Sequence, residues 1–171
     1  NIQYVRNLNG RGSMSINTNN CIRNSTGKYI KPLFQDDLFF NPKSLKHILD
    51  NLADPWMAHE YTHLDGTSGN YYRQRTPYIN DNFIGGINTL GPPSIICFIN
   101  DGNFFDEELS YLMDTEFYHR MIIKYGNPTI LQCNNPIGVV RTWSGQTTQT
   151  VTQYMIDTEL DYIKYKKYEN I

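Results

Sequence analysis

The sequence is poor in cysteine and has no long apolar run, and each shortage excludes a class of protein. The three cysteines, Cys21, Cys97 and Cys133, are widely spaced and include no CxxC pair. A disulfide framework is therefore excluded, and reduced thiols of an intracellular protein are expected. No apolar stretch approaches the roughly 20 residues that a membrane-spanning helix needs.

An excess of positive charge is also missing. The formal net charge is −2, so there is no basic field for a nucleic acid and no nucleic-acid partner is expected. No signal peptide is visible, although the chain opens with Asn1, and we expect the natural start to be missing. A cytoplasmic location follows. The alternative is a peripheral membrane contact through the basic "YKKYE" segment, which is otherwise a solvated helix end.

What remains is a globular composition, with 39% apolar and 13% aromatic residues in 171. Patterns of apolar residues and of caps predict strands alternating with helices, hence one α/β domain. Residues 65–83 are polar and turn-rich and are predicted to be a surface loop. The predicted strands are 2–6, 28–34, 93–99, 129–133 and 138–142. The predicted helices are 13–25 (closed by Gly27), one starting at Asn41-Pro42, 114–125 and 146–168.

Six short motifs occur in the same order as in a known family. Together they make the chain resemble the inverting family 2 glycosyltransferases, nucleotide-sugar enzymes of the GT-A fold. The matching stretches are "NNCIRNSTGKYI" with Asn19, Gly27 and Tyr29, the pair Asp36-Asp37, the helix-opening Pro42, the turn with Gly91, Pro93 and Ser94, Met113-Asp114 with Arg120, and Arg141-Thr142-Trp143.

The chain also departs from the family pattern. Phe34 stands where many members have a first aspartate, Met113 replaces a glutamate, and Trp143 replaces a histidine. The family begins with two further strands that hold the base and ribose, and nothing here resembles them. Residues 1–171 therefore resemble a single GT-A-like domain from its third strand onward. Its fold would be a mixed sheet flanked by helices, N-terminally incomplete.

The resemblance implies a hexosyltransferase that moves a sugar from a nucleotide-diphosphate donor to an acceptor hydroxyl. The acceptor would be a saccharide, a lipid-linked group or a protein, and Mn²⁺ or Mg²⁺ would assist. It assigns Asp36, Asp37 and Arg141 to the donor, with Asp37 as metal ligand, because a diphosphate needs a cation and hard cations prefer carboxylates. The alternative for the two aspartates is an ordinary turn at a strand end.

Asp114 is the candidate base of this reaction, because it stands where the family has an acidic pair before a helix. The alternative role is an N-cap, and the two are compatible. A helix N-terminus would lower the pKa of Asp114 and keep it ionised. The acceptor would meet Gly91, Pro93, Ser94 and Trp143. The alternatives are an ordinary loop for the turn and a packed core residue for the tryptophan.

The pentapeptide "HEYTH", residues 59–63, supports a rival function. On a helix, His59 and His63 would share a face and hold zinc, with Glu60 as general base of a peptidase. The family resemblance makes the segment a strand, which would separate the two imidazoles by about 13 Å. We interpret the motif as a coincidence. A third alternative is a remnant that binds sugar or a partner without turnover, and exposed sheet edges would favour a homo-oligomer.

Overall fold

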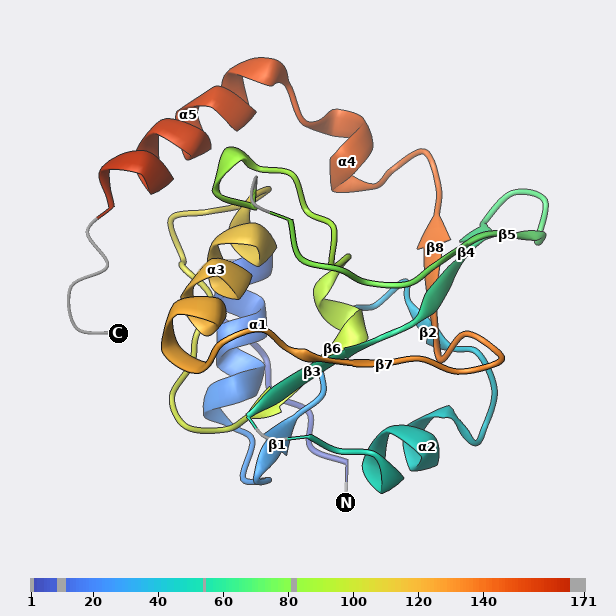
Figure 1. Cartoon of the computed structure of the whole chain (residues 1–171). Coiled ribbons are helices and arrows are strands. Elements are labelled where there is room, and N and C mark those ends of the chain that lie inside the picture. Colours follow the sequence, from blue (N-terminus) through green and yellow to red (C-terminus); the bar gives the residue numbers. More distant parts are fainter. Residues whose placement is uncertain (1, 9–11, 54, 81–82, 167–171) are drawn as a thin grey trace.

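The protein is a mixed α/β structure with two four-stranded sheets. The computed structural model describes residues 2–8, 12–53, 55–80 and 83–166 (Figure 1). The first sheet has the order β1-β6-β3-β7 and the second the order β2-β8-β4-β5. Their bounds are β1 (Tyr29–Ile30), β2 (Leu38–Phe39), β3 (Trp56–His59), β4 (Tyr61–Asp65), β5 (Tyr71–Arg75), β6 (Ile96–Ile99), β7 (Thr129–Leu131) and β8 (Gly138–Thr142).

Both sheets mix strand directions. The β3–β7 and β4–β8 pairs are parallel, and the remaining pairs are antiparallel. One residue, Glu60, joins the sheets. Its N–H donates to the carbonyl of Leu131 beside the first sheet, and its carbonyl accepts from Ile137 and Gly138 beside the second. The expected single sheet is therefore divided, and the division falls in the middle of HEYTH.

Helices flank the sheets, and they begin where capping residues allow. Ser13 caps α1 and Thr152 caps α5 through their side-chain oxygens. In Figure 1, α2 lies below the sheets and α4 and α5 lie above them. The helices are α1 (Met14–Arg23), α2 (Ser44–Asp50), α3 (Met113–Tyr125), α4 (Thr147–Thr150) and α5 (Gln153–Tyr165), with two 3-10 turns, η1 (Phe83–Gly85) and η2 (Pro93–Ile95).

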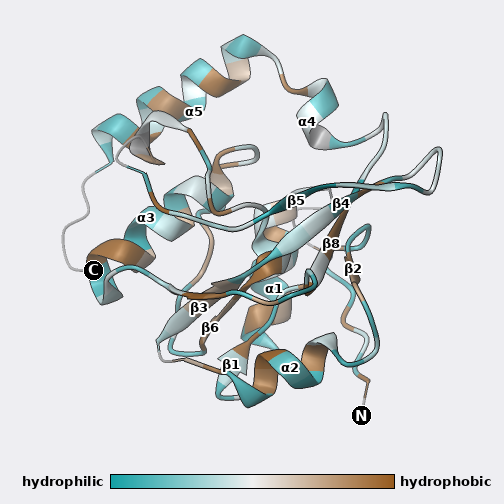
Figure 2. Cartoon of the chain, turned by 45° about the vertical axis from the view of Figure 1, so that its right-hand side comes forward, coloured by the Kyte–Doolittle hydropathy of each residue, from teal (hydrophilic) through white to brown (hydrophobic). Residues whose placement is uncertain are grey.

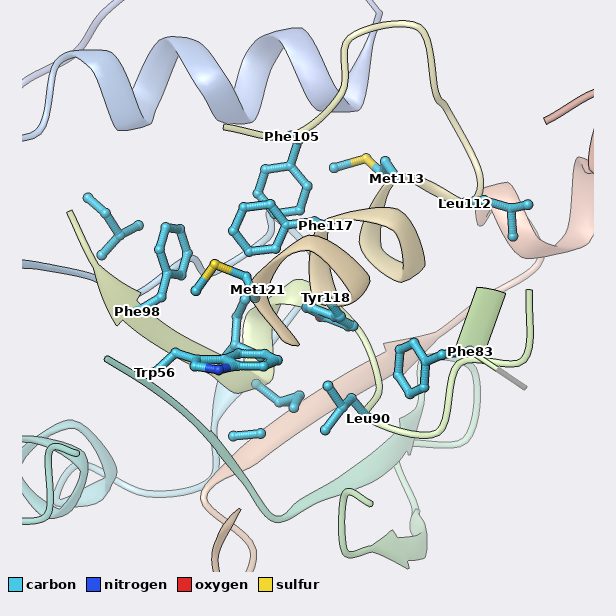
Figure 3. Packing of buried hydrophobic residues seen from close by; sticks show 14 of the residues in the cluster. Trp56, Phe83, Leu90, Phe98, Phe105, Leu112, Met113, Phe117, Tyr118 and Met121 are labelled. Carbon is cyan, nitrogen blue, oxygen red and sulfur yellow. The ribbon is translucent and has the colours of Figure 1, made fainter. Parts of the chain in front are cut away.

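The main core lies between α3 and the first sheet (Figure 3). Phe117 and Tyr118 of α3 are fully buried, as are Trp56 of β3 and Phe98 of β6. The rings of Phe105 and Phe117 stack with centroids 4.3 Å apart. Aromatic pairs in this geometry add to the stabilisation from buried area alone, so α3 is held firmly against the sheet.

A carboxylate from α5 binds the backbone just before α3. Leu112 occupies the N-cap position and has no side-chain cap. The backbone N–H groups of Ser110, Tyr111 and Leu112 instead donate to the carboxylate of Glu159, at 2.7 to 3.2 Å. This negative charge also complements the positive end of the helix dipole.

Several predicted elements are confirmed, including the helix ending at Gly126, the strand over 138–142 and the extended HEYTH segment. Others are wrong. Residues 2–6 form no strand, and Ile2 and Tyr4 are exposed. The first helix ends at Arg23 with Asn24 as its C-cap, so Gly27 does not close it. The loop predicted over 65–83 contains β5, and the last predicted helix divides into α4 and α5, with 167–168 outside the described residues.

Figure 2 shows the hydropathy of the elements. β5 is coloured as hydrophilic, and all five of its residues are exposed. Within the described part of the chain, none of the helices has both the length and the hydrophobicity that crossing a bilayer requires.

Candidate functional site

Two neighbouring aspartates follow the extended segment that leaves β1. Asp37 is buried and Asp36 is half-buried. The N–H of Asp37 donates to the carbonyl of Phe34, which closes a tight turn just before β2. The two aspartates therefore do lie in a turn at a strand end, as one alternative had it. This turn directs the carboxylate of Asp37 into the protein, whereas an ordinary surface turn would leave it in water.

Residues from two remote segments meet these aspartates. The backbone N–H of Arg141 donates to the Asp37 carboxylate at 3.4 Å. The hydroxyl of Ser94 accepts from the N–H of Phe34 at 2.9 Å and lies close enough to Asp37 to lower its pKa. The indole N–H of Trp143 donates to Asp36 at 3.1 Å. We call Asp36, Asp37, Ser94, Arg141 and Trp143 the carboxylate site. All five are residues that the sequence singled out, although Arg141 contributes its backbone and its side chain is exposed.

Burial raises the pKa of Asp37 to about 6. Hydrogen bonds from Ser94 and Arg141 oppose this rise, and the negative charge of Asp36 adds to it. A carboxylate of this kind is poorly hydrated, so a nearby cation stabilises its ionised form strongly.

Lys31 is a half-buried cation beside the carboxylate site that sequence reasoning missed. Its ammonium donates to the carbonyl of Ser94 and, at 3.0 Å, to that of Pro32. Burial lowers the pKa of Lys31 to about 8, and the charges of Cys97 and Asp37 oppose that fall. The available signal was the lysine itself, since a charged residue inside the apolar segment "KYIKPLF" needs buried partners.

Asp114 lies in the first turn of α3, in a second polar cluster. One of its oxygens accepts from the side-chain amide of Asn88 at 2.7 Å. The other accepts from the N–H of Thr115 at 2.6 Å and from the Thr115 hydroxyl at 3.1 Å. Asn88, which sequence reasoning also missed, therefore holds Asp114 in place from outside the helix.

Two expectations about Asp114 are wrong. It is not the N-cap, because the helix begins at Met113 and Glu159 caps it. Its pKa is not lowered, because burial outweighs the hydrogen bonds from Thr115 and Asn88 and raises it to about 6. The helix terminus favours the ionised form of Asp114, but burial disfavours that form by more.

The turn that contains Gly91 and Ser94 joins the two clusters. Asn88 accepts from the Gly91 N–H and donates to the Gly91 carbonyl, both at 2.9 Å. Three residues later, Ser94 meets Asp37. The Cα atoms of Gly91 and Ser94 are at most about 11 Å apart, because an extended residue spans at most about 3.6 Å. Asp114 and Asp37 therefore belong to opposite ends of one short turn.

Gly91 is required at its position for two reasons. Its φ is +116°, a conformation that side chains disfavour. A Cβ there would also lie 2.9 Å from the ring of Tyr61. The hydroxyl of Tyr118 adds a hydrogen bond to the Gly91 carbonyl at 3.0 Å. Pro93, the remaining residue predicted for the acceptor, is buried in η2 between the two clusters.

HEYTH does not form the helix that a zinc peptidase would use. His59 ends β3 and His63 lies in β4. Burial lowers the pKa of His59 to about 3. The carboxylate of Glu60 accepts from Thr76 at 2.5 Å and from the N–H of Cys133 at 3.1 Å. The acid of the motif is therefore held in a structural network where the two sheets meet.

The carboxylate site fits a hard divalent cation better than it fits zinc. The described residues contain no group of three or more His, Cys, Asp or Glu side chains able to hold a metal. Mg²⁺ in nucleotide sites typically takes one or two carboxylates and completes its shell with phosphate and water oxygens. Asp37, with Asp36 next to it, meets that requirement.

Comparisons with known proteins add no identification. The chain matches no protein-family model and, in a search of curated proteins, no sequence.

Proposed function

We propose that this chain is a glycosyltransferase domain that transfers a sugar from a nucleoside-diphosphate donor to an acceptor hydroxyl, with inversion. One observation carries the proposal. Three distant stretches, each chosen for its likeness to the family, meet at Asp36 and Asp37 and bring Ser94, Arg141 and Trp143 to them. The pairing of β2 with β8 is what places Asp37 beside Arg141.

In this proposal the carboxylate site receives the diphosphate end of the donor. Asp37 would hold Mn²⁺ or Mg²⁺, and Asp36 would contact the ribose or a water of the ion. The ion supplies positive charge that stabilises the leaving diphosphate. Trp143 fixes Asp36 through its indole N–H and offers a partly exposed ring.

Asp114 is the proposed base. The acceptor oxygen forms a bond to the anomeric carbon while the bond from that carbon to the diphosphate oxygen breaks. The nucleoside diphosphate leaves, and the hydroxyl proton moves to the Asp114 carboxylate. A base works best when its pKa lies near the working pH, and a pKa of about 6 meets this condition better than the lowered value first expected. The buried turn from Gly91 to Ser94 connects the Asp114 cluster with the carboxylate site, and the acceptor would bind near it.

The proposal is tested by nucleotide binding to the protein. We would titrate it with UDP and with GDP, each with and without MnCl₂, by calorimetry. Binding should require Mn²⁺ and should weaken at least about tenfold in Asp37→Asn, since one metal–carboxylate contact is lost. Asp50→Asn is the matched control, because Asp50 is exposed and pairs with Lys46 on the same helix. Binding that is independent of Mn²⁺, or unchanged in Asp37→Asn, would overturn the assignment.

Other properties that the resemblance implies stay predictions. They are the class of acceptor, a cytoplasmic location and a homo-oligomer. The structure offers edges for such assembly, because β1 and β7 border the first sheet and β2 and β5 border the second. An exposed strand edge can pair with another chain.

A further inference from the structure

β4 and β5 form a hairpin that projects from the body of the protein (Figure 1). The hairpin carries a row of rings that begins at the turn between the two clusters. The centroids of Tyr61 and His63 lie 5.4 Å apart, and those of His63 and Tyr72 lie 5.3 Å apart. We call these three residues the aromatic row. Its inner end contacts Gly91, and at its outer end the Tyr72 hydroxyl lies 2.9 Å from that of Thr142. Thr142 directly precedes Trp143, so the row borders the carboxylate site.

A bulge in β5 decides which side chains join this face. Tyr72 and Arg75 each pair directly with a member of the aromatic row, whereas Arg73 and Gln74 together face Thr62. Side chains alternate along a regular strand, so residues three apart would point to opposite faces. The extra residue of the bulge brings Tyr72 and Arg75 to the same face.

The bulge is held in a strained conformation. Arg73 has a φ of +54°, a conformation that non-glycine residues rarely adopt. The carbonyl of Tyr72 accepts from the Thr62 hydroxyl at 3.1 Å, and that of Arg73 pairs with the ring nitrogen Nδ1 of His63 at 3.0 Å. Backbone strain that is held in place by specific hydrogen bonds is typical of functional positions.

Two positive charges lie next to the aromatic row. Burial raises the pKa of Tyr61, and the charges of Arg75 and Arg73 oppose the rise. Burial lowers the pKa of His63, and the same two charges lower it further. Both arginines are exposed. Among the described residues, no carboxylate forms an ion pair with either of them.

We propose that the aromatic row and Arg75 form a binding site for an anionic saccharide, which would be the acceptor of the reaction proposed above. Tyr72 is exposed and His63 is half-buried, so their rings can offer flat apolar faces to a sugar ring, whereas Tyr61 is buried and supports them from the inner end. The guanidinium of Arg75, which has no ion-pair partner among the described residues, suits a carboxylate or phosphate on that sugar, because it can donate two parallel hydrogen bonds. That the bound saccharide is the acceptor rests on the proposed function, whereas the binding site itself does not.

The test uses the protein and two probes, tetragalacturonate and neutral maltotetraose, titrated by calorimetry and by NMR. Tetragalacturonate should bind at least tenfold more tightly than maltotetraose. Tyr72→Ala and Arg75→Gln should each weaken its binding at least tenfold, and both positions are exposed, so these variants should fold. Deletion of Gln74 should abolish binding by removing the bulge. Lys46→Gln is the matched control and should bind within twofold of the natural chain, because it also removes one exposed positive charge but lies on α2, outside the β4–β5 hairpin.

Three results would overturn the proposal. One is failure of tetragalacturonate to bind, or equal binding of the neutral probe. The second is unchanged binding in both Tyr72→Ala and Arg75→Gln. The third is that UDP displaces tetragalacturonate and itself loses affinity in Tyr72→Ala, which would make this face part of the donor site. Asp37→Asn separates this proposal from the previous one, since it should weaken UDP with Mn²⁺ and leave tetragalacturonate binding unchanged.

Discussion

The indole N–H of Trp143 donates a hydrogen bond to the carboxylate of Asp36 across 107 positions of the sequence. This contact, together with the backbone bond from Arg141 to Asp37, joins the end of β8 to the segment that leaves β1. The aspartates are therefore positioned by a strand that is distant from them in the chain.

Trp143→Phe tests the importance of that contact. The variant keeps an aromatic ring and loses only the N–H donor. A hydrogen bond to a charged group contributes about 1.5 to 3 kcal/mol when buried, and less at this half-exposed position. We therefore expect the affinity for UDP with Mn²⁺ to fall about three- to tenfold by calorimetry, with little change in thermal stability. Unchanged affinity would show that Asp36 needs no support from Trp143.

Asp114→Asn should remove the base and retain the donor site. Turnover should fall about 10²- to 10⁴-fold, the usual contribution of a positioned base. Donor binding should stay within about twofold, because Asp114 belongs to the other end of the turn. The rate of transfer from a nucleotide sugar is measured by the release of the nucleoside diphosphate. Glu108→Gln, an exposed change in the preceding loop, is the control. Loss of donor binding in parallel with turnover would make Asp114 a structural residue.

The contribution of Asp37 to the free energy of unfolding should increase as the pH falls from 7 towards 4. Its pKa is about 6 in the folded state against 3.8 for the free group, so the unfolded chain loses this proton first as the pH rises. Stability is then lost between about pH 4 and 6, by up to about 3 kcal/mol for two pKa units. Urea unfolding across this range should show a weaker slope in Asp37→Asn than in the natural chain. An equal slope would contradict the burial effect on Asp37.

Activity should follow the opposite trend. Asp37 must be ionised to hold a cation, and Asp114 must be ionised to accept a proton. Both pKa values are about 6, so affinity for UDP with Mn²⁺ and turnover should fall together below that pH. The same ionisation that destabilises the fold therefore creates the site.

Gly91→Ala should unfold more easily than a change at another glycine of similar backbone conformation. Gly102 also has a positive φ, +92°, but a Cβ there would meet nothing within 4 Å. Gly102→Ala should therefore show only the backbone penalty, about 1 to 2 kcal/mol. Gly91→Ala should add the collision with Tyr61 and exceed that value by about 1 to 3 kcal/mol, the usual effect of overpacking. Chemical denaturation of both variants measures the difference, and equal values would contradict the contact.

Sequence reasoning predicted the local structure around several candidate residues. The two aspartates lie in a turn, Gly91 lies in a turn before a buried strand, and Asp114 lies in the first turn of a helix, although it does not open that helix. The pKa of Asp114 was predicted in the wrong direction because its burial, which depends on residues far away in the sequence, outweighs hydrogen bonds such as that from Asn88. Lys31 was missed for the same reason, since its partners are backbone carbonyls that no pattern reveals.

The fold was less predictable where pairing decides the structure. β5 reads as a polar loop because neither face of it is buried, and it is a strand only because β4 pairs with it. Residues 2–6 have an alternating pattern, and no described strand accepts their hydrogen bonds. The division into two sheets at Glu60 depends on carbonyl and N–H partners near both sheets, which a sequence pattern cannot supply.

The carboxylate of Glu159 has a consequence for the order in which the protein forms. It satisfies three backbone N–H groups ahead of α3, the helix that carries Asp114. During synthesis, α3 emerges from the ribosome well before α5. Until Glu159 follows, the segment just before that helix lacks the partner of its three N–H groups. This contact therefore forms only after the strands of both sheets have been synthesised.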